Sequence, residues 1–594
     1  MSRRLARVPI PPRWRPAVLG LGLFVLLAVQ FAVMFFSAAG DSATYDEVAH
    51  LPAGYAYLEV GEYRLNPEHP PLIKDLAALP LLFMDLNFPA EAYHSPSTAV
   101  NNQWEFGQRF LFGSGNDADR LLRFGRLPIM LLSLATGLLV FSWARELFGR
   151  AAGIVALLLY AFDPNLLAHS RYVTMDLGIT FALFLHLYCL WRYLQKPGRA
   201  RGALAAVTLA VALVTKFSAG LLAPVYLVVA GLLLLGERGS PWPRSGRRLG
   251  GLAVIGGLGL LLAWLFYLLH TLQLSPETQR ALISQMLPEG TLANVLAGFS
   301  DHVLLRPIAQ YVLGFVWIAQ SVEAGRVAFL FGETSTAGWW YYYPAAILLK
   351  TALPLLLLVP LTLAVWKRLP RQDRFTEIYL WLLPAALLLA GTQASLNLGI
   401  RYMLPLYPFV FVFVSRLAGL WGTGGARLDL GPRVARLALP VLLVWYATTS
   451  LTAYPNYLSY FNELAGDRGY RYLADSNVDW GQDLKRLDAW LEQTGLEEIR
   501  LDYFGRALPE YYLGEKYRKW TVQDGRPQGW FAVSVTRYQL SRLSEPSYSW
   551  LDGLRPVEVV GGSIFVYYLA DSSHRTALVI GTRDEAMLRR CPIG

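Results

Sequence analysis

The composition of this 594-residue chain excludes a soluble enzyme, a disordered polymer and a disulfide-rich scaffold. Hydrophobic residues make up 54% of the chain and charged residues 16%, against about 45–50% and about 25% in an ordinary globular protein. The apolar excess falls in runs of about 20 residues, which is the length that a helix needs to cross a bilayer. We therefore predict a polytopic α-helical membrane protein.

The net charge of +10 does not indicate a nucleic-acid partner, because the basic residues are spread over short connections between apolar runs. In membrane proteins such residues fix the orientation of the spans. Two cysteines occur, Cys189 and Cys591, and this number excludes a disulfide framework. No small-residue cleavage site follows the first apolar run convincingly, so we expect a retained first span rather than a signal peptide.

The apolar runs predict about 11 transmembrane helices. Their ranges are 17–37, 127–147, 151–168, 176–194, 203–220, 221–236, 249–269, 343–366, 376–394, 400–420 and 434–453. The runs 203–220 and 221–236 are separated only by the polar residues Thr215, Lys216 and Ser218. An odd number of spans places the two termini on opposite sides of the membrane.

Lysine and arginine residues concentrate in alternate connections. Five arginines precede the first span, and the connections after every second span are also rich in lysine and arginine. The other short connections carry little more than Arg171, Lys216 and Arg401. Because positively charged connections stay in the cytoplasm, we predict a cytoplasmic N-terminus, an extracytoplasmic C-terminus and a multi-pass location in the cytoplasmic (inner) membrane.

Three long segments then face outward. They cover residues 38–126, 270–342 and 455–594. The first two are loops of a transmembrane domain that comprises residues 1–454. The third has strand-like alternation at 529–535 and 561–569 and a helical run at 483–493, a mixture that predicts a C-terminal extracytoplasmic α/β domain.

Asp46 and Glu47 follow the first span by only a few residues, so both are expected close to the membrane surface. A carboxylate at that depth is suited to act as general base on a hydroxyl whose co-substrate is held in lipid. The alternative is that these are ordinary solvated acids of an outward loop.

The run Asn66-Pro67-Glu68-His69-Pro70-Pro71 holds a carboxylate and an imidazole in a rigid, extended stretch, because proline fixes the backbone on both sides. Glu68 and His69 are candidate metal ligands with oxygen and nitrogen donors. His69 is equally a candidate phosphate contact. A plain loop before a helix start is the alternative.

Asp176 stands where the fourth predicted span begins. An ionisable residue at membrane depth is costly and often functional, although an acid in the first turn also satisfies the helix dipole. His169 and Arg171, which precede it, are candidate anion contacts.

Five consecutive aromatic residues, Trp339 to Tyr343, open the eighth predicted span. Trp339 and Tyr342 belong either to an interfacial belt or to a groove for a sugar or an isoprenoid chain. Lys350 lies about two turns deeper, a costly place for a lysine unless it neutralises an acid or a phosphate. Arg401 begins the tenth span from outside, where a guanidinium is suited to bind a lipid phosphate.

These motifs resemble a known family when they are taken in order. The motifs are Asp46-Glu47, NPEHPPL at 66–72, Asp176, GWWYYYP at 338–344 and RYMLPLYP at 401–408. Together they resemble the GT-C class of membrane glycosyltransferases, in particular the protein O-mannosyltransferase group (glycosyltransferase family 39), with the aminoarabinose transferases of lipid A as relatives. The resemblance covers essentially the whole chain, and the tail motif SNVDWGQDLKRL at 476–487 resembles bacterial members of the group.

The resemblance implies transfer of a sugar from a polyprenyl-phosphate donor to an acceptor hydroxyl on a protein, lipid or glycan, outside the cytoplasmic membrane. Asp46 matches the catalytic acid of the family and Asp176 its second loop acid. The implied reaction is an inverting displacement in which Asp46 is the base and Glu47 orients Asp46 or the acceptor. Any of Arg401, Lys350 and Arg171 is then placed to compensate the charge of the leaving phosphate.

A divalent metal ion is the one cofactor that the resemblance leaves open. Glu68 matches an acid that contributes to a metal site in the aminoarabinose branch, whereas His69 stands where that branch has a lysine. The same branch uses a histidine in a later loop, for which His302 is available in this chain.

Two other classes of function remain at this point. A transporter also has many spans with a few buried charges, but its polar residues usually gather near the bilayer midplane on broken helices. A non-catalytic envelope assembly factor would use the tail as its binding module. For the enzyme, we predict that Asp46, Glu68 and Asp176 line one outward-opening cavity, with a basic side chain near them because three carboxylates repel one another.

The tail is predicted to fold separately and not to carry the catalytic base. Its polar cluster Asp475, Asn477, Asp479 and Asp483 indicates either cation or acceptor binding, or a loop of Asn and Asp turns that leads into a capped helix.

Overall fold

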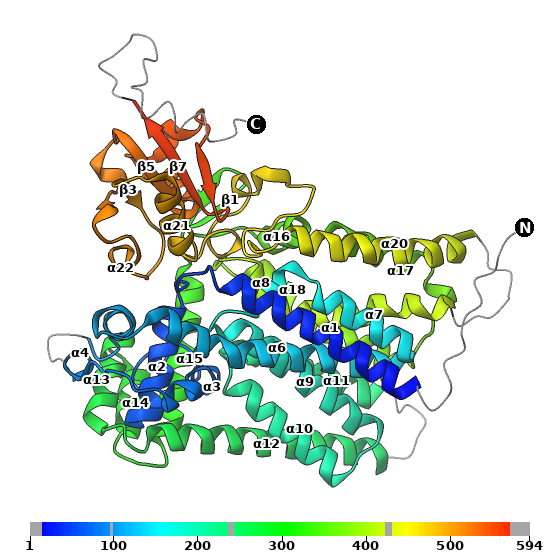
Figure 1. Cartoon of the computed structure of the whole chain (residues 1–594). Coiled ribbons are helices and arrows are strands. Elements are labelled where there is room, and N and C mark those ends of the chain that lie inside the picture. The colour runs from blue at the N-terminus through cyan, green and yellow to red at the C-terminus, as the bar shows by residue number, and fades with distance from the viewer. Residues whose placement is uncertain (1–14, 95–98, 236–242, 422–429, 571–594) are drawn as a thin grey trace, which may run out of the picture.

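The computed structural model describes residues 15–94, 99–235, 243–421 and 430–570. A bundle of long helices carries a mixed β-sheet at one end, and the first helix begins at the opposite end (Figure 1). Cys591 and the arginines before residue 15 lie outside the described residues.

Each predicted span coincides with helical structure. The helices of the bundle are α1 (Arg15–Ala38), α6 (Ala118–Phe148), α7 (Arg150–Ala161), α9 (Met175–Gln195), α10 (Arg199–Leu213), α11 (Leu222–Leu235), α12 (Pro243–Thr271), α16 (Tyr342–Lys350), α17 (Leu353–Ala364), α18 (Arg374–Gln393), α19 (Tyr407–Ser415) and α20 (Leu430–Thr452). Among the described residues, eight helices are long and apolar enough to cross a membrane, or nine if the bent pair α16–α17 counts as one span. The chain is thus a multi-pass membrane protein, but the predicted number of 11 is not confirmed.

Helix length explains most of the difference in number. Helices α7 and α10 have 12 and 15 residues, which corresponds to about 18 and 22 Å at about 1.5 Å per residue. The hydrocarbon core of a bilayer is about 30 Å thick. The sequence alone does not separate these short helices from the turns next to them, so each is predicted as one span of about 20 residues.

The predicted span 343–366 is broken rather than straight. Helices α16 and α17 meet at 106°. Pro354 occupies the first turn of α17, and a proline has no N–H to donate to the carbonyl four residues earlier, that of Lys350, so α16 cannot continue through it. Lys350 is the last residue of α16, so it stands at this corner.

The outward segments predicted from the sequence gather at the end of the bundle that carries the sheet (Figure 1). The first segment contains α2 (Glu47–Val60), α3 (Leu72–Ala78), η2 (Leu79–Phe83), α4 (Ala90–His94) and α5 (Gln103–Gln108). The second contains α13 (Pro276–Met286), α14 (Thr291–Phe299), α15 (Arg306–Ala324) and the hairpin β1 (Ala328–Leu330) with β2 (Glu333–Ser335).

The tail forms a five-stranded sheet in the order β4-β3-β5-β7-β6. Its elements are α21 (Leu484–Thr494), β3 (Ile499–Asp502), α22 (Pro509–Leu513), β4 (Tyr517–Lys519), β5 (Gly529–Ser534), α23 (Val535–Leu540), β6 (Glu558–Val560) and β7 (Ile564–Leu569). Strand β3 runs parallel to β4 and β5, whereas β7 is antiparallel to β5 and β6. The alternation at 529–535 and 561–569 therefore corresponds to β5 and β7.

One buried apolar cluster joins the tail to the first outward segment. Leu51 of α2, Leu487 of α21 and Leu501 of β3 all belong to it. Burial of shared apolar surface stabilises the contact between the two parts. The tail is consequently packed onto the loop that begins with Asp46.

Candidate active site

The side chain of Arg401 joins two acids that are distant in sequence. Its Nη1 donates to Oδ2 of Asp46 at 3.0 Å and to Oδ2 of Asp176 at 3.3 Å. Asp46 immediately precedes α2, Asp176 lies in the first turn of α9, and Arg401 lies in the 3₁₀ segment η6 (Ile400–Leu406). Two of the three acids predicted to converge are therefore brought together by one guanidinium.

A second cation, Lys216, completes this cluster. Its Nζ donates to Oδ1 of Asp176 at 2.6 Å. Lys216 immediately precedes η4 (Phe217–Leu221), the turn between α10 and α11. The Asp176 side chain is 1% exposed, whereas that of Asp46 is 19% exposed. Asp46 is thus the acid of this pair that solvent or a substrate can reach.

Aromatic rings hold both cations in place. The guanidinium carbon of Arg401 lies 4.4 Å from the ring centre of Trp480 and 5.1 Å from that of Tyr402. The Nζ of Lys216 lies 4.7 Å from the same Tyr402 ring. Cations are attracted to the faces of aromatic rings. Arg401 nevertheless keeps Nε buried without a hydrogen-bond partner among the described residues.

Two neutral histidines border the cluster. The rings of His50 and His69 are 5.4 Å apart, and Nδ1 of His50 lies 3.1 Å from the Val173 carbonyl oxygen. Burial lowers the pKa of His50 to about 4, although the charge of Asp46 acts in the opposite direction. Burial also lowers the pKa of His69 well below its usual range. Both imidazoles are consequently uncharged near pH 7.

Glu68 makes contacts on another side of this loop. Within the described residues its carboxylate accepts from Nδ2 of Asn101 at 3.2 Å and from Nε2 of Gln103. Neither contact involves Asp46 or Asp176. Direct contacts therefore join two of the three acids, and the convergence of all three stays a prediction.

The same loop fits a metal site only partly. In the ranges that the structure describes, no three His, Cys, Asp or Glu side chains lie together as metal ligands. Glu68 and His69 would supply two donors, and the carboxylate is already engaged by two amides. His302 is exposed in the connection between α14 and α15. Metal binding at Glu68 and His69 stays a prediction.

Glu47 supports the loop that carries Asp46. It is buried and accepts from Nε of Arg126 at 2.8 Å and from Nη2 at 2.7 Å. The backbone N–H groups of Thr44 and Val173 donate to the same carboxylate, each at 2.9 Å. Of the two roles considered for Glu47, this arrangement favours orientation of Asp46.

Lys350 and Arg171 contact the tail, and their role as phosphate contacts stays a prediction. The Nζ of Lys350 donates to the backbone carbonyls of Leu458, Tyr460 and Asn477. Three acceptors use all the donors of an ammonium group. Arg171 pairs with Asp41 at 3.3 Å and donates to the Pro455 carbonyl at 3.1 Å. The Lys350 ammonium is thus satisfied by protein groups, whereas Arg171 keeps Nε buried without a hydrogen-bond partner among the described residues.

The aromatic side chains of residues 339–343 differ in how deeply they are buried. Tyr342 is buried, and its hydroxyl accepts from Nδ2 of Asn477 at 3.0 Å. The backbone N–H of Trp339 donates to Asn397 Oδ1 at 2.7 Å, and its ring is half-buried. Tyr342 therefore belongs to the contact with the tail, whereas Trp340 remains exposed.

Three residues of the cluster were not predicted as site residues, namely Lys216, Tyr402 and Trp480. Asp475 was considered only for cation or acceptor binding by the tail. Lys216 was recognisable from the sequence, because it is the single charged residue in the outward break between two apolar runs. Burial raises the pKa of Asp475 while Arg401 opposes this shift, which places the carboxyl near the cluster. A sequence pattern does not reveal that tail residues reach the membrane domain.

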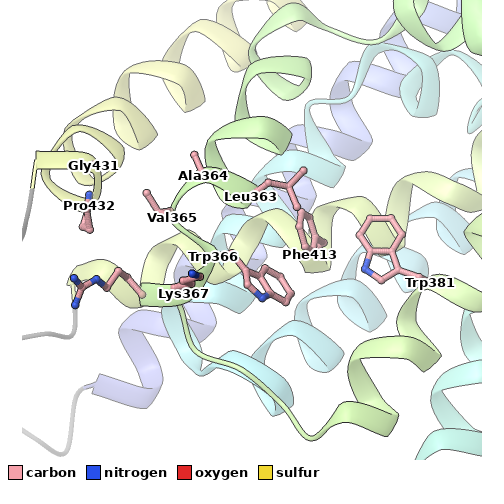
Figure 2. Close-up of a pocket in the computed structure, with 10 residues that line it drawn as sticks. Leu363, Ala364, Val365, Trp366, Lys367, Trp381, Phe413, Gly431 and Pro432 are labelled. Atoms are coloured by element: carbon pink, nitrogen blue, oxygen red, sulfur yellow. The ribbon is translucent and has the colours of Figure 1, made fainter.

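Two large hollows of the described surface are lined by residues other than the acids. One of about 780 Å³ lies at the C-terminal end of α17 and is lined by Trp366, Lys367 and Trp381 among others (Figure 2). Another, of about 820 Å³, lies between the end of α20 and the β6–β7 edge. Neither contains Asp46, so a cavity shared by the acids stays a prediction.

Part of the chain is similar to a known protein family. Residues 122–267 match the family model for dolichyl-phosphate-mannose-protein mannosyltransferase. The matched region contains Asp176 and Lys216. Over residues 122–267 the chain is thus similar to the protein O-mannosyltransferases. No curated protein matches the sequence significantly.

Several solved structures are similar to this chain at low sequence identity. ArnT from Cupriavidus metallidurans bound to undecaprenyl phosphate has 14% identity and a TM-score of 0.49, covering 91% of this chain and 97% of that one. The archaeal oligosaccharyltransferase AglB from Archaeoglobus fulgidus, in complex with an inhibitory peptide and a dolichol-phosphate, has 11% identity and a TM-score of 0.45, covering 94% and 75%. The S. cerevisiae protein O-mannosyltransferase Pmt1-Pmt2 complex bound to the sugar donor has 17% identity and a TM-score of 0.33, covering 46% and 35%.

Proposed function

We propose that the enzyme transfers a sugar from a polyprenyl-phosphate donor to an acceptor hydroxyl on the outer side of the cytoplasmic membrane. The observation that carries this proposal is the joint contact of Arg401 with Asp46 and Asp176. Two acids and two cations, Arg401 and Lys216, meet where α9 begins. A reachable carboxylate beside buried cations suits a reaction that removes a proton and releases a phosphate.

In this reaction the Asp46 carboxylate accepts the proton of the acceptor hydroxyl. The hydroxyl oxygen attacks the anomeric carbon and forms the new glycosidic bond. The bond from that carbon to the phosphate oxygen breaks, and polyprenyl phosphate leaves with the electron pair. Attack opposite to the leaving group inverts the anomeric configuration.

The cations stabilise the leaving phosphate because its charge increases as the bond breaks. Arg401 has an unpartnered Nε within the described residues, and Lys216 lies on the other side of Asp176. Asp176 is nearly inaccessible, so its role is to orient both cations before the donor binds. Preorganised charges require no rearrangement during the reaction.

The proposed sidedness follows from the distribution of lysine and arginine. The N-terminus is cytoplasmic, and the acids and the tail face outward in the inner membrane. The partners are then a lipid-linked sugar in the outer leaflet and a protein, lipid or glycan in the envelope. A divalent metal is part of the proposal only at Glu68 and His69, and no step above proceeds through it.

Purified protein tests the proposal directly. The donor is undecaprenyl phosphate carrying a radiolabelled sugar, the acceptor is envelope membrane from cells that lack the gene, and several sugars are compared. We expect time-dependent transfer and release of undecaprenyl phosphate, with inversion detected by NMR of the product. If the protein is instead a transporter or an assembly factor, no sugar is transferred from any donor. Its function in cells should then not depend on Asp46 and should survive Asp46→Asn.

A further inference from the structure

A short tail segment, residues 476–483 (SNVDWGQD), lies between the loop that carries Asp46 and the segment that carries Arg401. On the first side, the backbone N–H of Ser42 donates to the Gln482 carbonyl at 2.9 Å. The N–H of Tyr45 donates to the Trp480 carbonyl at 2.8 Å. The hydroxyl of Ser42 adds a bond of 3.0 Å to the Gly481 carbonyl. These bonds fix the backbone up to the residue before Asp46.

On the second side, the same segment holds the residues that precede Arg401. The N–H of Ile400 donates to Oδ1 of Asn477 at 2.9 Å, and the hydroxyl of Ser476 donates to the Leu398 carbonyl. The approach at Gly399 is so close that a Cβ there would lie 2.6 Å from the Ser476 hydroxyl oxygen. Gly399 also has a φ of 142°, a conformation that favours glycine.

Trp480 contacts both the loop that carries Asp46 and the side chain of Arg401. Its carbonyl accepts from Tyr45, and its ring face lies against the guanidinium of Arg401. The side chain is 2% exposed and also packs against the ring of His169, 5.9 Å away. A buried ring in this place does not bind a sugar itself. It restricts the positions that the guanidinium can take.

Ion pairs anchor the C-terminal end of the segment. Nη1 of Arg486 lies 2.6 Å from Oδ1 of Asp41 and also pairs with Asp483. Asp41 in turn accepts from the Tyr172 hydroxyl at 2.9 Å. The tail is therefore attached to residues 41–45 by both backbone bonds and buried charges.

We propose that residues 476–483 are a positioning element of the active site, and that Trp480 acts through Arg401 to set the contact between Arg401 and Asp46. The proposal rests on the proposed function and assigns part of the active site to the tail. Residues 41–44 have no regular secondary structure, and an arginine side chain loses much rotamer freedom when it is ordered. Contacts with residues 476–483 fix both residues 41–44 and the side chain of Arg401.

The test compares turnover of Trp480→Leu, Trp480→Phe and Trp550→Leu in the full-length protein. Trp550 is a tail tryptophan that packs against Phe531 and Tyr548 and serves as the matched control. We expect Trp480→Leu to lower kcat by roughly 10- to 100-fold, since misplacement by about 1 Å has effects of that size. The KM for the acceptor should change less than the kcat. Trp480→Phe should restore most of the activity, and Trp550→Leu should match the wild type.

A double-mutant cycle with Arg401→Lys separates positioning from general destabilisation. If Trp480 acts through Arg401, Trp480→Leu should have little further effect on kcat in the Arg401→Lys background. Multiplicative losses, or near-normal turnover by Trp480→Leu, would overturn the positioning role. The wild type distinguishes this result from failure of the proposed function: if the wild type transfers no sugar from any donor, the function is wrong, whereas an active wild type beside a near-normal Trp480→Leu contradicts only the role of Trp480.

Discussion

Asp46 and Asp176 share a single nitrogen of Arg401, at 3.0 and 3.3 Å, and only Asp46 is accessible. The difference in burial separates their roles. Asp176 also binds Lys216 at 2.6 Å, so its charge is balanced within the protein. Asp46 has one cationic partner and an open side from which a hydroxyl can approach.

Asp46→Asn should abolish most transfer. An amide has nearly the shape of the carboxylate but does not accept the acceptor's proton, and general-base catalysis contributes about 10²- to 10⁴-fold. Binding of undecaprenyl phosphate should persist, because Arg401 and Lys216 remain. Turnover and lipid binding are measured on the same purified sample. Wild-type turnover by this variant would exclude Asp46 as the base.

Asp176→Asn should cost stability as well as activity, because Lys216 then stays buried without its acid. Removing one partner of a buried ion pair costs about 3–5 kcal/mol. The unfolding temperature in detergent should fall. The matched variant is Asp176→Asn with Lys216→Met, which removes both charges and should recover part of the stability but not the activity. Equal unfolding temperatures for the single and double variants would contradict this coupling.

The sequence predicted the residues of the site better than their contacts. Asp46, Asp176 and Arg401 were each recognised from their position near a predicted membrane boundary, where a charge is costly. Lys350 satisfied the same criterion, yet it binds carbonyls of the tail. Position in a span indicates that a charge needs a partner, but it does not distinguish a ligand from a distant backbone carbonyl.

The tail motif shows the same limit. Asp479 was considered for cation or acceptor binding, with a structural turn as the alternative. Its carboxylate accepts from the N–H groups of Gly481 and Thr536, each at 3.1 Å, and burial raises its pKa to about 7. These contacts favour the structural alternative. The docking of residues 476–483 depends on contacts more than 70 positions apart along the chain, which a local pattern does not encode.

Accessibility labelling tests the predicted orientation. Cysteines introduced at residues 245 and 520 should react with a membrane-impermeant reagent from opposite sides, because 245 lies in a connection rich in arginine and 520 lies in the tail. In a background where Cys591 is replaced by serine, intact right-side-out cells should label residue 520 and not residue 245. Labelling of both residues from one side would remove the outward assignment of Asp46. A control cysteine at residue 368 should behave like residue 245.

Acid should destabilise the site through His50. Burial lowers its pKa in the folded state to about 4, whereas an unfolded histidine has a pKa of about 6.5. Between these values the unfolded state binds the additional proton, so the free energy of unfolding contributed by His50 falls as the pH decreases, with a limit of about 1.4 kcal/mol per pH unit. The loss begins near pH 6.5 and is complete near pH 4. The measurement is the difference in unfolding temperature between wild type and His50→Gln at several pH values, because the difference cancels the other titrating groups. Wild type should lose stability relative to His50→Gln as the pH falls from 7 to 4, and a constant difference would show that His50 does not titrate in this window.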